Sequence, residues 1–253
     1  MQIAVQIAPA RADYSAIRRA AGEADTLGVD AIFNWDHFFP LGKERADKHF
    51  ECWTMLAAWA ESTGRAEIGA MVSCVAYRNA DLLADMARTV DHISAGRLIL
   101  GLGAGFREWE ATEYGYLFGS PAQRVRDLAD ALQRIERRLA VLNPPPTRKI
   151  PILVAADGPK VLRLVAQHAD IWHTFADGEA LGEKSRQLDG YCRDIGRDPA
   201  EIERSCFVEG DPWYVGPQLR KHGVGIFTVI AEGPHYDLDD VRRWLVWRDE
   251  QNA

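Results

Sequence analysis

The segment that decides the fold reads Gly96-Arg97-Leu98-Ile99-Leu100-Gly101-Leu102-Gly103-Ala104-Gly105-Phe106. It starts as an apolar strand and ends in glycines at alternate positions. Because glycine has no Cβ, glycines at the end of a strand let the backbone approach a flat ring or a phosphate closely. The segment therefore predicts a cofactor that lies across the C-terminal end of this strand.

The glycines also suggest a dinucleotide site, which the flanking sequence disfavours. A Rossmann fingerprint needs glycines that lead directly into a helix, whose N-terminus then meets the pyrophosphate. Here a loop rich in acids and aromatic residues follows, and the next helix is predicted to begin at Ser120-Pro121, with Ser120 as its N-cap. The glycines also lie in the middle of the chain. A Rossmann site is therefore the weaker interpretation.

Segments typical of strands and of helices alternate along the chain of 253 residues. Strands are predicted at 2–7, 31–35, 67–73, 98–102, 150–155, near 171, 202–208 and 225–230. Helices are predicted at 15–27, 52–61, 80–93, 125–142, 161–167, 180–195 and 239–247, with a short or irregular unit between 211 and 222. This alternation is typical of an α/β protein of the (β/α)₈ TIM-barrel class, in which residues 1–253 form a single domain.

Composition narrows the possible partners and the cellular location. The formal net charge is −7 and no block of Lys and Arg stands out, which disfavours a nucleic-acid partner. Cysteines lie at 52, 74, 192 and 206 without metal-ligand spacing, which favours free thiols in a reducing cytoplasm. The first residues are typical of a strand and not of a signal peptide, and no apolar run is long enough to span a membrane. We expect no bound metal, because no histidine motif supports one.

In a barrel of this class the active site lies at the C-terminal ends of the strands. Asp36 and His37 follow the second strand and form the candidate catalytic pair, since an imidazole transfers protons near neutral pH. The alternative is that Asp36 caps a loop and His37 is a buried, hydrogen-bonded residue. Adjacent residues on a strand point to opposite faces, so the two side chains need not face one ligand.

A candidate phosphate site lies at Asp157-Gly158-Pro159-Lys160, before a predicted helix. The free N–H groups of a helix start, together with one lysine, suit an anion. The alternative is an ordinary helix start with a solvated Lys160.

Further motifs carry a family resemblance. They are Phe33-Asn34-Trp35-Asp36-His37-Phe38, Glu51-Cys52-Trp53-Thr54-Met55-Leu56-Ala57-Ala58, Ile68-Gly69-Ala70-Met71-Val72-Ser73, Asp91-His92-Ile93-Ser94-Ala95-Gly96-Arg97 and Ala169-Asp170-Ile171-Trp172-His173. Together with the glycine segment, they resemble the bacterial luciferase-like monooxygenase superfamily. More narrowly, they are similar to its branch of F420-dependent oxidoreductases.

The resemblance implies a deazaflavin, coenzyme F420, or the flavin FMN across the strand ends. Asp36 would lie beside the ring and His37 near its reacting edge, and Ser73 would begin a non-proline cis peptide under the ring. The residues expected to contact the cofactor are Asp36, Ser73, Cys74, Gly103, Ala104, Gly105, Ala156, Asp157, Gly158 and Lys160. In the sugar-phosphate dehydrogenases of this family an acid follows the glycines, whereas Phe106 stands there in this chain.

The expected function is that of an F420-dependent oxidoreductase that transfers hydride between the deazaflavin and a small organic substrate. Two alternatives remain open: an FMN-dependent monooxygenase on the same barrel, and a non-catalytic barrel that binds a flavin or has lost it. A homodimer is expected from the resemblance and from the general frequency of two-fold assemblies.

Overall fold

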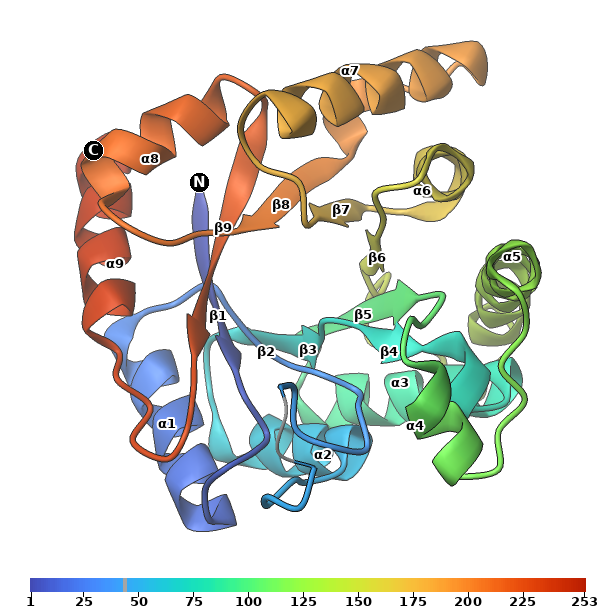
Figure 1. The fold of residues 1–253 in the computed structure, drawn as a ribbon, viewed down its shortest axis with the longest axis horizontal. Coiled ribbons are helices and arrows are strands. Elements are labelled where there is room, and N and C mark those ends of the chain that lie inside the picture. The colour runs from blue at the N-terminus through green and yellow to red at the C-terminus, as the bar shows by residue number, and fades with distance from the viewer. Residues whose placement is uncertain (43–44) are drawn as a thin grey trace.

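The structure is a computed structural model that describes residues 1–42 and 45–253. Its parallel strands close into a ring, with helices around the outside (Figure 1). Along the sheet the order is β3-β2-β1-β9-β8-β7-β6-β5-β4, and β3 also pairs with β5 to complete the ring. The strands are β1 (Gln2–Ile7), β2 (Ala31–Asn34), β3 (Glu67–Ala70), β4 (Ser73–Cys74), β5 (Leu98–Gly103), β6 (Ile152–Ala155), β7 (Ile171–Thr174), β8 (Glu203–Phe207) and β9 (Val224–Ala231). The predicted TIM barrel is confirmed.

The helices follow the strands in the order expected of this class. They are α1 (Tyr14–Leu27), α2 (Cys52–Ser62), α3 (Ala80–Ile93), α4 (Glu108–Glu113), α5 (Pro121–Leu139), α6 (Pro159–His168), α7 (Gly178–Asp194), α8 (Pro212–Arg220) and α9 (Asp239–Asn252), with 3₁₀ turns η1 (Val75–Tyr77) and η2 (Pro199–Glu201). Ser120 caps α5 as predicted, because its hydroxyl accepts a hydrogen bond from the Gln123 N–H at 3.3 Å. The unit expected to be irregular is α8, which contains Pro217.

Two local predictions are corrected at the third strand. The single strand predicted at 67–73 is two strands, β3 and β4, which pair with different parts of β5. The cis peptide joins Met71 and Val72, between the two strands. The prediction that it begins at Ser73 is wrong, because Ser73 already lies in β4 and pairs in register with Leu102.

A third correction concerns the segment after the glycines. The sequence predicted a loop until Ser120, whereas Glu108 to Glu113 form the short helix α4. Acidic residues near a helix N-terminus are stabilised by the helix dipole, and Glu108 and Glu110 lie in that first turn. The acids that were interpreted as loop composition are therefore partly helix-start residues.

Buried apolar residues fill the barrel and seal it against the helices. An inner cluster comes from the strands and, at Met71, from the link between β3 and β4; it consists of Ala4, Ala31, Phe33, Met71, Ile99, Leu153, Ile171 and Ile226. A larger cluster packs the strands against the helices, for example at Leu128 of α5 and Trp244 of α9. In the part of the chain that the structure describes, no helix is both long enough and apolar enough to cross a membrane.

Candidate active site

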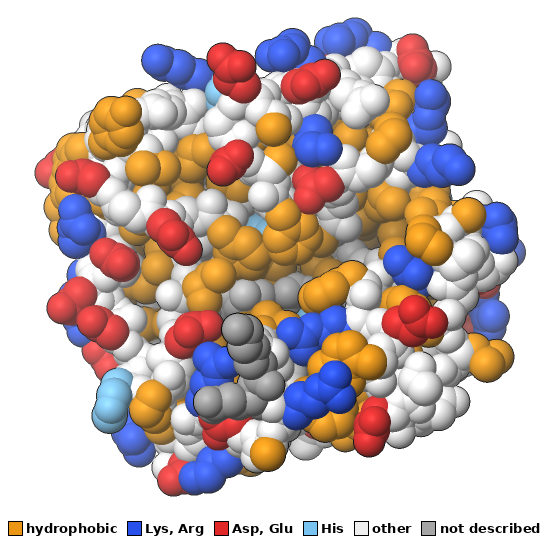
Figure 2. All heavy atoms as spheres, viewed as in Figure 1, with side chains coloured by type: hydrophobic (Ala, Val, Ile, Leu, Met, Phe, Trp, Pro, Cys, Tyr) orange, Lys and Arg blue, Asp and Glu red, His pale blue; other side chains and the backbone are white. Residues whose placement is uncertain are grey.

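The C-terminal ends of the strands meet in a cavity of about 380 Å³. Most of the residues predicted to form the site line it together: Asp36, His37, Cys74, Gly103, Ala104, Gly105, Ala156 and Asp157. Apolar side chains supply much of the remaining wall, among them Leu41, Met71, Val72 and Ile230. Figure 2 shows a hollow near the middle of the visible face with hydrophobic side chains around it.

Three of the predicted residues do not line the cavity. Ser73 is fully buried, and its hydroxyl accepts a hydrogen bond from the Trp53 indole N–H at 2.9 Å. Gly158 is the N-cap of α6 and Lys160 lies in the first turn of that helix, both exposed. The roles predicted for these three residues remain predictions.

Asp36 is held in an ion pair. Both of its carboxylate oxygens accept hydrogen bonds from Arg78, and the Cys74 N–H adds a third at 3.3 Å. Arg78 also contacts Glu51, the N-cap of α2, at 2.6 Å. Burial raises the pKa of the Asp36 carboxyl, and the Arg78 guanidinium opposes that rise. Asp36 therefore connects the segment after β2 to β4 directly and, through Arg78, to the start of α2.

His37 pairs with a buried acid that the sequence analysis did not single out. Its Nδ1 lies 2.7 Å from Glu110 Oε2, and Glu110 is fully buried in α4. Arg107 donates to Glu110 Oε1 at 2.9 Å, and the Tyr77 hydroxyl donates to Oε2 at 3.3 Å. The one available signal was the spacing of Arg107 and Glu110, which suits an i,i+3 pair only if a helix begins there. Because that segment was predicted to be a loop, the pair was missed.

The glycines at the end of β5 are explained by packing inside the protein. A Cβ on Gly103 would lie 2.6 Å from Val72 Cγ2, and one on Gly105 would lie 2.6 Å from Cys74 Sγ. Gly105 also has a positive φ of +74°. These glycines therefore allow residues 72–74 to pack closely against the end of β5. Ala104, between the two glycines, lines the cavity.

Asp157 turns its carboxylate toward the end of β7. It accepts hydrogen bonds from the Thr174 hydroxyl at 2.6 Å and from the Phe175 N–H at 3.3 Å. The Lys184 ammonium donates to the backbone carbonyl of Asp157 at 2.5 Å. The negative charge beside the proposed phosphate site is thus already hydrogen-bonded to the end of β7 and the residue after it.

Two exposed phenylalanines flank the mouth of the cavity. Phe106 is 69% exposed and Phe175 is 64% exposed, although both line the cavity. The Phe106 ring lies edge-on to His37, with ring centroids 5.3 Å apart. The residue that follows the glycines, Phe106, thus places an aromatic ring at the mouth of the cavity.

His173 of β7 belongs to the protein interior. His173 is fully buried, and its Nδ1 lies 2.9 Å from the Ser205 hydroxyl. Burial lowers the pKa of His173 to about 3, so the ring is neutral. His173 is not among the residues that line the cavity.

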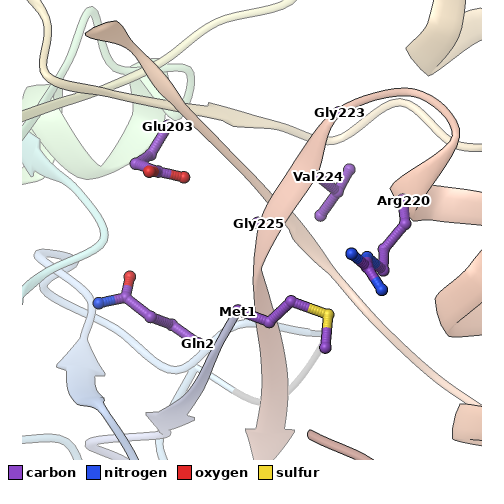
Figure 3. Close-up of a pocket in the computed structure, with 7 residues that line it drawn as sticks. All are labelled: Met1, Gln2, Glu203, Arg220, Gly223, Val224 and Gly225. Atoms are coloured by element: carbon purple, nitrogen blue, oxygen red, sulfur yellow. The ribbon is translucent and has the colours of Figure 1, made fainter. Parts of the chain in front are cut away.

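A second pocket lies at the opposite edge of the barrel, where β1, β8 and β9 begin (Figure 3). Its lining consists of Met1, Gln2, Glu203, Arg220, Gly223, Val224 and Gly225. Figure 3 shows Glu203 and Arg220 on opposite sides of the strand that carries Gly225. None of the residues predicted for the site lies here, so the cavity at the strand ends remains the candidate site.

The residues of that cavity fit a planar, largely apolar ring. Ligand sites of this kind combine mostly apolar walls with a few placed polar groups. Here the walls are apolar, and His37 and Asp157 lie among them. Within residues 1–42 and 45–253, no group of three or more His, Cys, Asp or Glu side chains is arranged to hold a metal ion.

Comparison with known proteins places these features in context. The sequence profile described as luciferase-like monooxygenase matches residues 1–209. An F420-dependent glucose-6-phosphate dehydrogenase of Intrasporangium calvum is 30% identical over 279 residues, covering 91% of this chain and 80% of that protein. A phthiodiolone/phenolphthiodiolone dimycocerosates ketoreductase of Mycobacterium sp. (strain JLS) is 32% identical over 181 residues, covering 62% of this chain and 47% of that protein. The chain thus spans about half the length of several curated relatives that it matches.

Solved structures share the fold. An F420-dependent secondary alcohol dehydrogenase in complex with an F420-acetone adduct superposes with a TM-score of 0.82 at 15% identity, covering 98% of this chain and 97% of that chain. The oxygenating constituent of 3,6-diketocamphane monooxygenase from Pseudomonas putida, in complex with FMN, gives a TM-score of 0.66 at 16% identity, covering 83% of this chain and 68% of that chain.

Proposed function

The chain belongs to the luciferase-like monooxygenase family, and on that basis we propose that it is an F420-dependent oxidoreductase that transfers hydride between the deazaflavin and a small organic substrate. Support comes from the relative named as an F420-dependent dehydrogenase and from the structural neighbour that holds an F420-acetone adduct. The observation that carries the proposal is one cavity at the strand ends, with apolar walls and a hydrogen-bonded imidazole.

The chain would hold the ring of the cofactor by apolar contacts and its anionic tail by polar groups. When bound, the deazaflavin supplies the hydride chemistry, and the protein supplies binding and orientation. Met71, Val72 and Ile230 give apolar contact and keep water out. The start of α6, with Lys160, suits an anionic tail, because free N–H groups and a cation favour negative charge.

His37 is proposed to carry the proton. Reduction of a carbonyl adds hydride to carbon and a proton to oxygen, and oxidation of an alcohol removes both. A positioned imidazole can exchange that proton near neutral pH. His37 lines the cavity, whereas Asp36 is engaged by Arg78. Asp36 is therefore proposed to hold the β2 turn and, with it, the position of His37.

Titration of the purified full chain with F420 and with FMN tests the proposal. We expect F420 to bind tightly and FMN to bind weakly, measured by calorimetry and by cofactor fluorescence. Ala104→Leu places a larger side chain on the cavity wall and is expected to weaken binding. Ala122→Leu, at an exposed position of α5, is the matched control and should bind as the wild type does.

The FMN-dependent monooxygenase remains the second candidate, because a structural neighbour with the same fold is a monooxygenase in complex with FMN. Tighter binding of FMN than of F420 would favour it. Binding of neither cofactor would contradict both and favour a barrel without this chemistry.

The homodimer and the cytoplasmic location remain predictions. Light scattering coupled to size-exclusion chromatography tests the first, and fractionation of cells that express the native chain tests the second. A monomer at micromolar concentration would contradict the dimer.

A further inference from the structure

Glu110 holds one of the two ring nitrogens of His37. Its Oε2 lies 2.7 Å from His37 Nδ1, and its other oxygen accepts a hydrogen bond from Arg107 at 2.9 Å. The carboxylate is fully buried in α4, while His37 lines the cavity. Glu110, which does not line the cavity, thus contacts His37, the residue proposed to carry the proton.

The charge state of Glu110 decides which nitrogen carries the hydrogen. Burial acts to raise the pKa of Glu110, but hydrogen bonds from His37 and Arg107 outweigh it and the net shift is downward. An ionised carboxylate only accepts hydrogen bonds, so His37 Nδ1 must donate. In a neutral imidazole the other nitrogen, Nε2, is then an acceptor.

We propose that Glu110 is a positioning residue that fixes His37 in the Nδ1–H tautomer, so that Nε2 accepts or returns the hydroxyl proton of a substrate in the cavity. The catalytic part of this inference rests on the proposed function. In alcohol oxidation a bound, oxidised deazaflavin would take up the hydride from the carbon, that is, the hydrogen of the C–H bond with its electron pair. The O–H proton goes to Nε2, and the carbonyl forms. The reverse reaction returns both.

The neighbouring residues Asp36 and His49 are less suited than His37 to exchange a proton with the substrate. Asp36 is paired with Arg78. His49 accepts a hydrogen bond from the Trp35 indole at Nε2, 3.1 Å away, and burial lowers the pKa of His49 to about 4. Among the described residues, no hydrogen-bond partner contacts His37 Nε2. His37 is thus the imidazole on the cavity wall, and Glu110 orients it.

Nitrogen NMR of the ring tests the tautomer without cofactor or substrate. The full chain is labelled with ¹⁵N-histidine, and the His37 signals are assigned by their loss in His37→Gln. In the wild type, at a pH where the ring is neutral, we expect a protonated Nδ1 and an unprotonated Nε2. Glu110→Gln, which is nearly isosteric, is expected to give a mixture of both tautomers, because an amide can donate as well as accept.

Glu113→Gln is the matched control, since it removes an exposed carboxylate from the same helix. It should keep the wild-type tautomer. An unchanged tautomer in Glu110→Gln would overturn the inference. An Nε2–H tautomer in the wild type would overturn it as well, and this spectrum needs no variant that could fail to fold.

Kinetics and binding separate this inference from the proposed function. Glu110→Gln is expected to bind F420 as the wild type does and to lose roughly 10²-fold in kcat with little change in KM. If neither cofactor binds but the tautomer shifts as expected, the proposed function fails and the positioning role of Glu110 stands. If F420 binds and Glu110→Gln keeps the wild-type kcat and tautomer, the positioning role fails alone.

Discussion

At the scale of single residues, three acids near the cavity are each hydrogen-bonded to a partner. Asp36 pairs with Arg78, Glu110 with His37 and Arg107, and Asp157 with the end of β7. Burying an unpaired carboxylate is costly, so such pairing is expected wherever acids lie under a ligand site. His37 differs from these acids because no described residue engages its second nitrogen, which supports the proposal that it exchanges a proton with a ligand.

Substitution of His37 tests its role directly. His37→Ala is expected to bind the cofactor as the wild type does and to lose about 10²–10⁴ fold in kcat, because a positioned proton carrier is removed. His235→Ala, at an exposed position, is the control. Binding is measured by titration and turnover by cofactor absorbance. Unchanged turnover would remove His37 from the mechanism.

The buried His173 predicts a dependence of stability on pH. Its pKa is about 3 in the folded state against 6.5 for the unperturbed side chain. Between these values the unfolded chain binds more protons, so the free energy of unfolding falls as the pH falls below about 6.5. The contribution is at most about 1.4 kcal/mol per pH unit and ends near pH 3.

His173→Asn removes this titration and should flatten the decline, measured by urea unfolding at a series of pH values. His235→Asn should leave the decline as in the wild type. If the His173→Asn and wild-type profiles run parallel below pH 6.5, His173 is not the cause.

At the scale of elements, the contact between β4 and the end of β5 shapes the cavity wall. Gly105 and Gly115 have nearly the same φ, +74° and +73°, but only Gly105 has a neighbour close to where a Cβ would lie. An alanine at either position bears the cost of positive φ, roughly 1 kcal/mol. An alanine at Gly105 must also displace Cys74 Sγ.

Gly105→Ala is therefore expected to lower the free energy of unfolding by about 1–3 kcal/mol more than Gly115→Ala. Adding Cys74→Ala should recover most of that extra loss, since the clashing sulfur is removed. Urea unfolding of the single and double variants measures the coupling. Equal losses in the two glycine variants would show that the contact with Cys74 is not limiting.

Element prediction from the sequence succeeded where hydrophobic period and helix caps agreed, as at Ser120-Pro121 and along the apolar strand of β5. It failed where the pairing of strands decides the local structure. The break between β3 and β4 reflects two registers on β5, which no local pattern encodes. The contact between Glu110 and His37 was missed because the segment of Glu110 was predicted to be a loop and because His37 lies 73 residues away in the sequence.

At the scale of the whole molecule, the ring is closed by the two ends of the chain. β1 pairs with β9 in register from Gln2–Ile226 to Ile7–Ala231. Two neighbouring strands of the barrel therefore come from opposite ends of the sequence. The TIM-barrel class was predictable because βα alternation runs through the chain. The register between β1 and β9 was not, because it is set by the closure of the ring and not by a local sequence pattern.

This closure favours the prediction that residues 1–253 form a single domain. Unfolding followed by tryptophan fluorescence and by circular dichroism should give coincident transitions. Buried tryptophans report on both ends of the chain, Trp53 and Trp59 on one side and Trp244 and Trp247 on the other. Two separate transitions, one for each end, would contradict a single domain.

The segment 106–113 joins two properties that could have been separate. Phe106 forms part of the aromatic rim, and Glu110, four residues further along the chain, is proposed to orient the imidazole. We expect a library that randomises this whole segment to give mostly inactive variants. Each variant would change access to the cavity and, at the same time, lose the contact that fixes the His37 tautomer. Diversifying Phe106 and Phe175 while keeping Arg107 and Glu110 would let selection explore new substrates on an intact proton route.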